Sequence, residues 1–225
     1  MNYPSLCILF KNMSIIRMGG DKMRNKFMLI TFLIFTLFST PKSAEDFING
    51  AIKSVDGTVI ENGSRIEITN TKDFNIRELD DVLSKCDENK VKISIDEEAL
   101  ELEGRVIINT TSKDNSFSVE TLNKDILKEV TREDRNIKVF SYVKAQLREG
   151  DLELYKNNLE KYLINTGGKN IKFSSIDSGV TGVALVNMDN FKELDNTLFN
   201  INFALVKYTS GTYIIVGTPI ITCAY

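Results

Sequence analysis

The chain has 225 residues, with 28 lysine and arginine residues, 31 aspartate and glutamate residues, and neither histidine nor tryptophan. Because the first 44 residues hold six of the basic residues and one of the acidic ones, the remainder carries 22 basic and 30 acidic side chains, a formal net charge of −8. This charge argues against nucleic acids and anionic lipids as partners, and the lack of histidine excludes Ser-His-Asp and Cys-His catalysis.

The N-terminal region has the pattern of a secretory signal. An apolar run over residues 27–38 (FMLITFLIFTLF) follows Arg24 and Lys26 and precedes small residues that end at Ala44. A basic start, a short apolar run and a small-residue end are typical of a signal peptide, and the run is shorter than the roughly 20 residues that span a bilayer. We therefore predict a signal peptide over residues 23–44, cleaved after Ala44. Because Lys42 disfavours that cut, an uncleaved membrane anchor is the alternative.

The residues before Met23 do not fit a signal peptide. Residues 19–23 (GGDKM) are compatible with a purine-rich ribosome-binding sequence placed ahead of a start codon. We therefore predict that Met23 is the true start and that residues 1–22 are translated leader. The exported part is then residues 45–225, a length that suits one domain, or two small ones, with a substantial core.

Helical periodicity appears twice in the first half of this domain. Apolar side chains recur on one helical face of residues 45–55, and a turn signal follows. Farther on, Asn75 with Glu78 three residues later is the signature of a capping box. The apolar spacing behind it predicts a helix of about three turns over residues 76–86.

Alternating apolar and polar residues predict four strands in the same half. In chain order they are residues 64–69, residues 91–95, a return strand that includes residues 106–108, and residues 117–121. The charged segment 123–136 is predicted to be a connector.

The second half repeats this pattern. Residues 137–147 predict a long strand, and residues 152–163 predict a helix closed by Gly167-Gly168. A strand, a tight turn and a return strand follow between residues 171 and 186. A second capping signal at Asn190 and Glu193 then predicts a helix that continues to Tyr208.

Both halves therefore have the order strand, helix, strand, tight turn, strand, and residues 90–108 resemble residues 170–186. We interpret them as two copies of one unit, about 45–128 and 129–225. The predicted fold class is α+β: two repeats packed as one body, either directly or by exchange of strands, with antiparallel sheets and helices on one face.

The C-terminus reads as a strand with a kink. Residues 214–216 and 220–221 are apolar and β-prone, and Gly217-Thr218-Pro219 lies between them. The run from Val216 to Thr222, with Tyr225 at the end, resembles the terminal signature of the YwmB-like family of secreted Firmicute proteins. This resemblance implies a TATA-box-binding-like fold, a Gram-positive source and a cell-surface location. It supplies no catalytic residues and no cofactor, and its signature positions are Gly217, Thr218, Pro219 and Tyr225.

Three motifs have a possible chemical meaning, and for each we prefer a structural interpretation. Ser141-x-x-Lys144 matches a serine-enzyme motif, but it lies in a predicted strand and lacks partner motifs. Gly167-Gly168-Lys169 lacks the rest of a phosphate loop and is typical of a helix end. The predicted turn after residue 95 is rich in carboxylates, which suit the wet face of a strand and fit no calcium loop; they are Asp96, Glu97, Glu98, Glu101 and Glu103.

Four aromatic residues of the second half are candidates for a binding groove: Phe140, Tyr142, Tyr155 and Tyr162. We expect most of them to lie in the core, and the groove is the alternative location for some. Cys86 and Cys223 either form one disulfide outside the cell or remain two separate buried thiols. No Cys-x-x-Cys pair or Cys/His cluster is present, so we expect no zinc site and no metal or other cofactor.

Two functions fit these features. The first is a non-catalytic binding module of the cell envelope, with an envelope protein or a cell-wall component as partner; a groove between the repeats would support it. The second is a carboxylate-dependent hydrolase of an envelope polymer, which needs two acids about 5–10 Å apart across a cleft. Binding of nucleic acid, suggested only by the fold name, is the least favoured alternative.

Overall fold

The computed structural model describes residues 43–71, 74–96, 99, 104–114, 118–188, 191–194 and 196–223. The predicted leader and the predicted apolar signal lie outside these residues. The predicted cleavage point after Ala44 falls in the first turn of a helix. Among the described residues, no helix is both long enough and apolar enough to cross a membrane.

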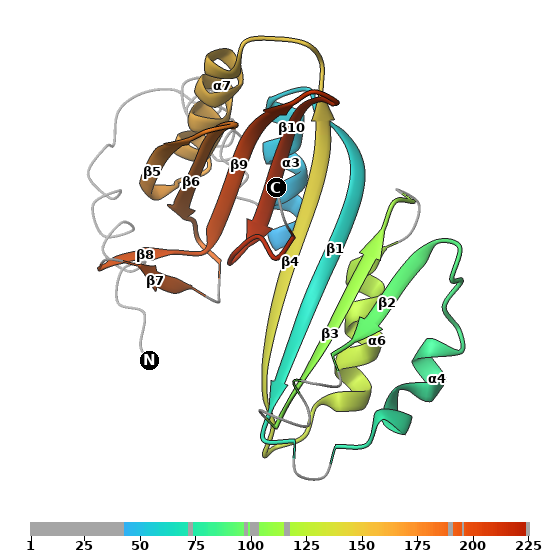
Figure 1. The fold of residues 1–225 in the computed structure, drawn as a ribbon. Coiled ribbons are helices and arrows are strands. Elements are labelled where there is room, and N and C mark those ends of the chain that lie inside the picture. The colour runs from blue at the N-terminus through green and yellow to red at the C-terminus, as the bar shows by residue number, and fades with distance from the viewer. Residues whose placement is uncertain are drawn as a thin grey trace, which may run out of the picture. The chain divides into compact units, whose positions relative to one another are not determined.

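Eight of the described strands form one antiparallel sheet in the order β2-β3-β1-β4-β10-β9-β6-β5 (Figure 1). Their bounds are β1 Thr58–Thr69, β2 Val91–Ile95, β3 Arg105–Ser112, β4 Asn136–Leu147, β5 Lys169–Ile176, β6 Gly179–Leu185, β9 Ile201–Tyr208 and β10 Gly211–Thr218. Strands β7 Lys192–Leu194 and β8 Thr197–Phe199 form a separate small hairpin. The predicted α+β class is confirmed.

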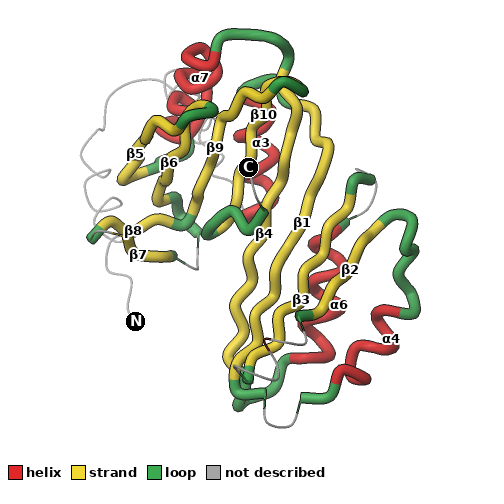
Figure 2. Tube along the Cα trace, in the orientation of Figure 1, coloured by secondary structure: helices red, strands yellow, loops and turns green. Residues whose placement is uncertain are grey.

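The helices lie on one face of the sheet (Figure 2). They are α3 Ala44–Ser54, the short pair η2 Ile76–Leu79 and α4 Asp80–Leu83, α6 Val119–Val130, and α7 Leu152–Asn165. The capping box predicted at Asn75 and Glu78 is present, although it opens two short turns rather than the three predicted. Gly167, with a positive φ of 81°, ends α7 where the sequence predicted it.

Two apolar clusters fill the space between helices and sheet. The first packs α3 and α7 against β9 and β10, with Phe47, Leu159 and Phe203 at its centre. The second packs η2, α4 and α6 against β1 and β3, with Leu79, Ile66 and Ile126 fully buried. Both clusters arise because alternate strand residues face the helices, while the residues between them face the other way.

A third cluster lies on the face without helices. It joins Tyr142, Val206 and Ile215 to Ile221 and Cys223 of the C-terminal segment. All three clusters fall within one compact unit, residues 40–225, which therefore has the core it needs to fold by itself.

The C-terminal segment corrects one prediction. Strand β10 ends at Thr218, so no single kinked strand continues through Ile221. The Thr218–Pro219 peptide bond is cis. A Cβ on Gly217 would lie 2.8 Å from the Ile220 oxygen, which shows how closely the chain folds back. The Ile221 amide then donates to Asn202 Oδ1 over 3.2 Å. Residues 211–218 pair with β4 and β9 as a strand of the sheet, whereas residues 219–223 fold back and cover part of the helix-free face.

The prediction of a strand at residues 117–121 followed by a connector was wrong. Ser118 caps a helix, α6, which continues to Val130. Its buried residues Val119, Leu122, Ile126 and Val130 recur at helical spacing and belong to the second apolar face. The short alternation that suggested a strand includes Phe117, which lies outside the described residues.

The prediction of a helix from Asn190 to Tyr208 was also wrong. Residues 192–199 form the β7–β8 hairpin, and residues 201–208 form β9, a central strand. Residues 203–206 are apolar on both strand faces because helices cover one face and the C-terminal segment covers the other. Such a continuous apolar run matches a buried strand as well as a buried helix, and β pairing on both sides decided the outcome.

The order strand, helix, strand, strand occurs in both halves: β1, α4, β2, β3 and then β4, α7, β5, β6. The hairpins β2–β3 and β5–β6 occupy opposite edges of the sheet. However, β1 pairs directly with β3, whereas β9 and β10 separate β4 from β6. The halves thus share an order of elements but not a strand pairing, and their origin as repeats stays a prediction.

Candidate ligand-binding groove

Two helices and two central strands enclose a groove with a volume of about 670 Å³. Helices α3 and α6 form its walls, and β1 and β4 form its floor. This volume is within the range of small-molecule sites. The floor strands pair along eleven positions, from Thr58↔Gln146 to Thr69↔Asn136, and this ladder holds the walls in place.

Both wall helices begin at the groove, and both begin in the same way. Ser43 Oγ accepts the Asp46 amide over 3.1 Å at the start of α3. Ser118 Oγ accepts the Thr121 amide over 3.1 Å at the start of α6. Serine caps of this kind satisfy amides that lack a partner within the helix. The two caps therefore define where the walls start.

The interior of the groove is mostly apolar. Ile48 of α3 and Val119 and Leu127 of α6 face Val139 and Val143 of β4. Asn62 of β1, Asn123 of α6 and Ser141 of β4 are polar residues of the lining. The Oδ1 of Asn62 is buried, and no described residue donates a hydrogen bond to it. A buried acceptor without a donor is uncommon and costs free energy. The side chain of Asn62 thus borders the groove, and its buried oxygen has no hydrogen-bond partner among the described residues.

The rim carries a pair of carboxyl groups in contact. Glu45 and Glu120 occupy the same position of the first turn in α3 and α6, two residues after the capping serines. Their side chains hydrogen-bond to each other, which raises the pKa of Glu45 and lowers that of Glu120. Lys124 Nζ lies 2.6 Å from Glu120 Oε1, so the lysine holds Glu120 in its charged form.

A buried hydroxyl network supports the α6 wall. Ser64 Oγ lies 2.6 Å from both Thr110 Oγ1 and Asn123 Oδ1. All three residues are buried, and Asn123 also borders the groove. The network fixes α6 on β1 and β3 at one rotation, since a turn of the helix would leave three polar groups unsatisfied.

The four aromatic residues predicted for a groove lie on two different faces. Phe140 and Tyr142 are buried on the helix-free face, where Lys192 Nζ lies 5.3 Å from the Phe140 ring and the Tyr142 hydroxyl donates to Glu61. Tyr155 and Tyr162 lie on helix α7 and pack in the first apolar cluster, on the face of the sheet that the helices cover. The four therefore do not form one site. Tyr142 is the member that also borders the groove.

The two α7 tyrosines have structural partners. The Tyr155 hydroxyl donates to the Arg148 oxygen over 2.9 Å. The Tyr162 hydroxyl donates to the Phe47 oxygen over 3.0 Å, and the two rings pack 5.3 Å apart. Burial raises the pKa of Tyr162 to about 12, so this phenol stays neutral at physiological pH. Both residues join α7 to its neighbours.

The other motifs from the sequence lie apart from the groove or take structural roles. Ser141 borders the groove, but Lys144 is on the opposite face, with Nζ 5.1 Å from the Tyr213 ring. The Gly168 amide donates to the Leu163 oxygen, as expected at a helix end. Of the five hairpin acids only Asp96 is described, and it accepts the Ala99 amide; Tyr225 likewise lies outside the described residues.

Cys86 and Cys223 are free thiols. Cys86 packs against the second apolar cluster and Cys223 against the third, on opposite faces of the sheet. Burial raises the pKa of each thiol, and Asp125 adds to the effect at Cys86. A raised pKa disfavours the reactive thiolate.

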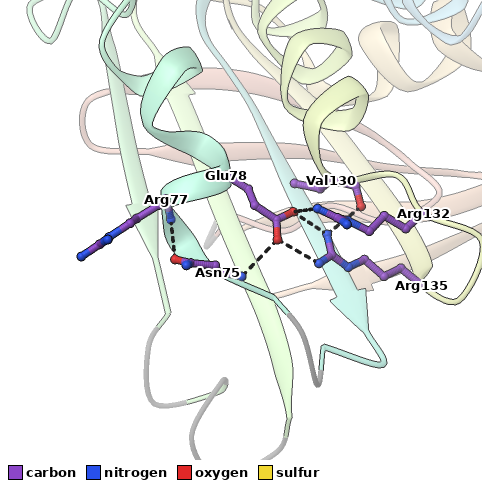
Figure 3. A network of polar contacts seen from close by, with 6 residues as sticks. All are labelled: Asn75, Arg77, Glu78, Val130, Arg132 and Arg135. Atoms are coloured by element: carbon purple, nitrogen blue, oxygen red, sulfur yellow. Dashed lines mark hydrogen bonds and ion pairs between the residues drawn. The ribbon is translucent and has the colours of Figure 1, made fainter.

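The most strongly perturbed carboxyl is Glu78, at the start of η2 (Figure 3). Arg135, whose side chain is only 2% exposed, donates to it over 2.9 and 3.1 Å, and Arg132 lies 3.2 Å away. These contacts lower the pKa of Glu78 to about 2. Perturbed groups of this kind are functional candidates, but every partner of Glu78 here is a cap or an ion pair that ties η2 to the segment after α6.

Sequence reasoning missed the residues that define the groove. Glu45, Glu120 and Asn62 belong to no motif, and residues 117–121 were expected to be a strand. One signal was present: Ser43 and Ser118 each precede an acidic residue by two positions, which is typical of a helix start. Even so, only tertiary packing brings the two helix starts together.

No family model and no curated protein matches the chain. Among solved structures it is similar to two crystal structures of the Staphylococcus aureus protein SA1388, one of them described as hypothetical, with 12% and 10% identity and a TM-score of 0.24 in each case. The matched regions cover 62% and 65% of this chain, and 44% and 46% of the two SA1388 chains. A Bacillus cereus protein related to NIF3 is 9% identical with a TM-score of 0.19, over 64% of this chain and 48% of that one. The chain spans less than half of each, and likeness at this level defines neither family nor function.

Proposed function

We propose that the chain is an exported, non-catalytic binding module of the cell envelope and that its ligand lies in the α3–α6 groove. The observation that carries the proposal is the groove itself, which has a volume of about 670 Å³ and a mostly apolar lining with a few polar side chains, among them Asn62, Asn123 and Ser141. Apolar walls with a few placed polar groups are the usual composition of a ligand site. Export rests on the signal-like residues 23–44, and the resemblance to the YwmB-like family supports it.

The carboxylate-dependent hydrolase receives less support from the groove. Glu45 and Glu120 are in hydrogen-bond contact, whereas glycoside hydrolysis needs two carboxyl groups about 5–10 Å apart with the scissile bond between them. The remaining acids of the predicted hairpin are outside the described residues, apart from Asp96.

Co-sedimentation with isolated Gram-positive cell walls tests the proposal. Residues 40–225 are incubated with walls at low and moderate salt, and the retained fraction is measured. We expect retention at both salts, because apolar burial is insensitive to ionic screening.

Two variants locate the binding. Asn49→Trp places a ring at the rim from an exposed position of α3, and we expect at least about a fivefold loss of retention, roughly 1 kcal/mol. Asn157→Trp is the matched control, since Asn157 is an exposed position of α7 away from the groove. Equal retention of both variants would remove the groove from the proposal, and no retention of the unsubstituted protein would direct the search to soluble partners.

A further inference from the structure

Strand β4 is paired along only part of one of its edges. On the β1 side the pairing runs from Asn136 to Gln146. On the β10 side it covers only Ser141 to Leu147, because β10 ends at Thr218 and the chain then folds back. Figures 1 and 2 show the first part of β4 with β1 on one side and no strand on the other. We call residues 136–140 the open edge of β4.

The backbone of the open edge has groups to offer to another strand. Every second residue of a strand directs its N–H and C=O groups away from the neighbour on one side. No described residue forms a backbone hydrogen bond with residues 136–140 from the β10 side. Unpaired groups of this kind are a template for strand addition, and the ladder with β1 already holds them in extended geometry. A strand that adds here continues the line of β10.

The two outer edges of the sheet are less suited to strand addition. Strand β2 has only five residues. Strand β5 has a shift of register between Lys169 and Lys172, and Asn170 Nδ2 donates to the Leu198 oxygen of β8 over 3.0 Å. Short strands and irregular ones are common at sheet edges because they hinder the pairing of a further strand. The open edge of β4 is regular and belongs to a long central strand.

The two faces of the open edge differ in chemistry. On the helix side, Ile137 and Val139 are apolar and only half-buried. On the helix-free side, Phe140 borders a cavity of about 430 Å³, which it forms with Arg65 and the C-terminal segment. Because the side chains of a strand alternate between the two faces, an added strand places every second side chain on the apolar side.

The helix-free face of the open edge has unpaired positive charge. Lys138 is exposed there, and Lys192 Nζ lies 5.3 Å from the centre of the Phe140 ring. Glu67 lies opposite Lys138 on β1, but its carboxylate is bound by Arg65 Nε over 2.9 Å. Neither lysine forms an ion pair with a described residue. Carboxylates on this face of an added strand complement the two ammonium groups.

We propose that the open edge of β4 binds an extended segment of a partner protein in which apolar and acidic side chains alternate. The segment adds to the sheet as a strand, and its backbone hydrogen bonds supply affinity. Its apolar side chains lie beside Ile137 and Val139, and its carboxylates lie beside Lys138 and Lys192. The inference goes beyond the proposed function, because it uses a strand edge and does not require a ligand in the α3–α6 groove.

Two synthetic peptides of about seven residues, the usual length of a strand, test the proposal. In one, valine alternates with glutamate; in the other, valine alternates with lysine; both have blocked ends. Each is titrated into residues 40–225 at pH 7, and the dissociation constant is measured by calorimetry. We expect the glutamate peptide to bind at least about tenfold more tightly than the lysine peptide.

Amide hydrogen exchange, followed by NMR, shows whether the peptide adds as a strand. On the open edge, alternate amides of residues 136–140 have no described partner on the β10 side and should exchange fast in the free protein. We expect the same amides to exchange at least about tenfold more slowly when the glutamate peptide is bound. The amides of β2 and β5, at the outer edges of the sheet, should be unaffected.

The double variant Lys138→Gln/Lys192→Gln tests the charge of the helix-free face. Neither lysine has an ion pair to lose, so we expect folding to be retained and the preference for the glutamate peptide to fall to about one. Lys92→Gln/Lys161→Gln is the control with the same change in net charge, at exposed positions of β2 and α7. Its preference should match that of the unsubstituted protein.

Several results would overturn the proposal. It fails if the glutamate peptide does not bind, or binds without slowing exchange at residues 136–140, and the groove keeps its separate test with Asn49→Trp. It also fails if the two peptides bind equally, or if the preference survives in the double variant. Slow exchange of these amides without peptide, increasing with protein concentration, would assign the open edge to a second copy of the chain and would overturn the proposal as well.

Discussion

The two ends of the eight-stranded sheet have the same order of elements but are stabilised differently. At the β5 edge, a 14-residue helix α7 covers the strands. The aromatic pair Phe47–Tyr162 joins α3 to α7, and the pair Phe173–Phe203 joins β5 to β9. At the β2 edge, the helix in the corresponding position of the element order is reduced to two short turns, η2 and α4, and α6 covers the strands beside them. A buried ion pair, Glu78–Arg135, and a hydroxyl network around Ser64 lie among the apolar side chains there.

This difference shows how a short helix is held in place. The stabilising free energy of apolar contact is roughly proportional to the buried apolar area. The two short turns of η2 and α4 therefore provide less of it than the four turns of α7. Directional polar bonds supply both attachment and orientation, at the cost of desolvating charged groups. We therefore expect the β5 end to be sensitive to loss of volume and the β2 end to be sensitive to loss of a partner.

The largest effect is predicted for the apolar end. Phe47 is fully buried against Tyr162, and Phe47→Ala should lower the free energy of unfolding by about 4 kcal/mol, because it removes a large side chain and leaves a cavity. Chemical denaturation of residues 40–225, followed by circular dichroism, measures the loss. Phe191→Ala is the control: that side chain is 63% exposed, and a loss as large as that of Phe47→Ala would contradict the explanation by burial.

At the polar end, Glu78→Gln should lower the free energy of unfolding by about 3 kcal/mol. Glutamine keeps the shape of the side chain and an acceptor for the Asn75 amide, but it leaves the buried Arg135 without its countercharge. Glu133→Gln, at an exposed position nearby, should change stability by less than about 0.5 kcal/mol. An equal effect of both substitutions would mean that the ion pair contributes nothing specific.

The pH dependence of stability tests the Glu78–Arg135 pair without a substitution, because acid removes the charge of Glu78 and leaves the packing unchanged. The pKa of Glu78 is lowered from 4.5 to about 2 by Arg135 and its other donors. Its stabilising contribution is therefore complete above pH 4.5 and is lost as the pH falls towards 2. Unfolding measured across this window should show a steeper loss of stability in the unsubstituted protein than in Glu78→Gln. If the two stability curves ran parallel across this window, the pairing with Arg135 would not be what lowers the pKa of Glu78.

A smaller effect is expected in the hydroxyl network. Ser64→Ala removes a bond to Asn123 and a bond to Thr110, both of which are buried, and should cost about 2 kcal/mol because these partners are left unsatisfied. Ser94→Ala, at an exposed position of β2, provides the baseline. If Ser64→Ala were neutral by thermal denaturation, the network would not be needed to hold α6 on the sheet.

Local patterns in the sequence were sufficient for several elements. Apolar residues at helical spacing predicted α3 and α7, and the run of β-prone residues from Ile137 to Leu147 predicted β4. Asn75 with Glu78 predicted a capped start that the structure contains. In each case neighbours in the chain carry the information, because the periodicity of side chains or the cap geometry involves only a few consecutive residues.

The groove and the two wrong predictions depended on contacts between distant residues. Residues 201–208 are a strand because β6 and β10 pair with both of their edges, and nothing in an apolar run indicates which partners it will find. Likewise Glu45 and Glu120 are 75 positions apart in the chain. They meet only because α3 and α6 pack on the same face of paired strands. The sequence by itself thus determined which segments are periodic and where helices start, and tertiary packing decided which of them share a site.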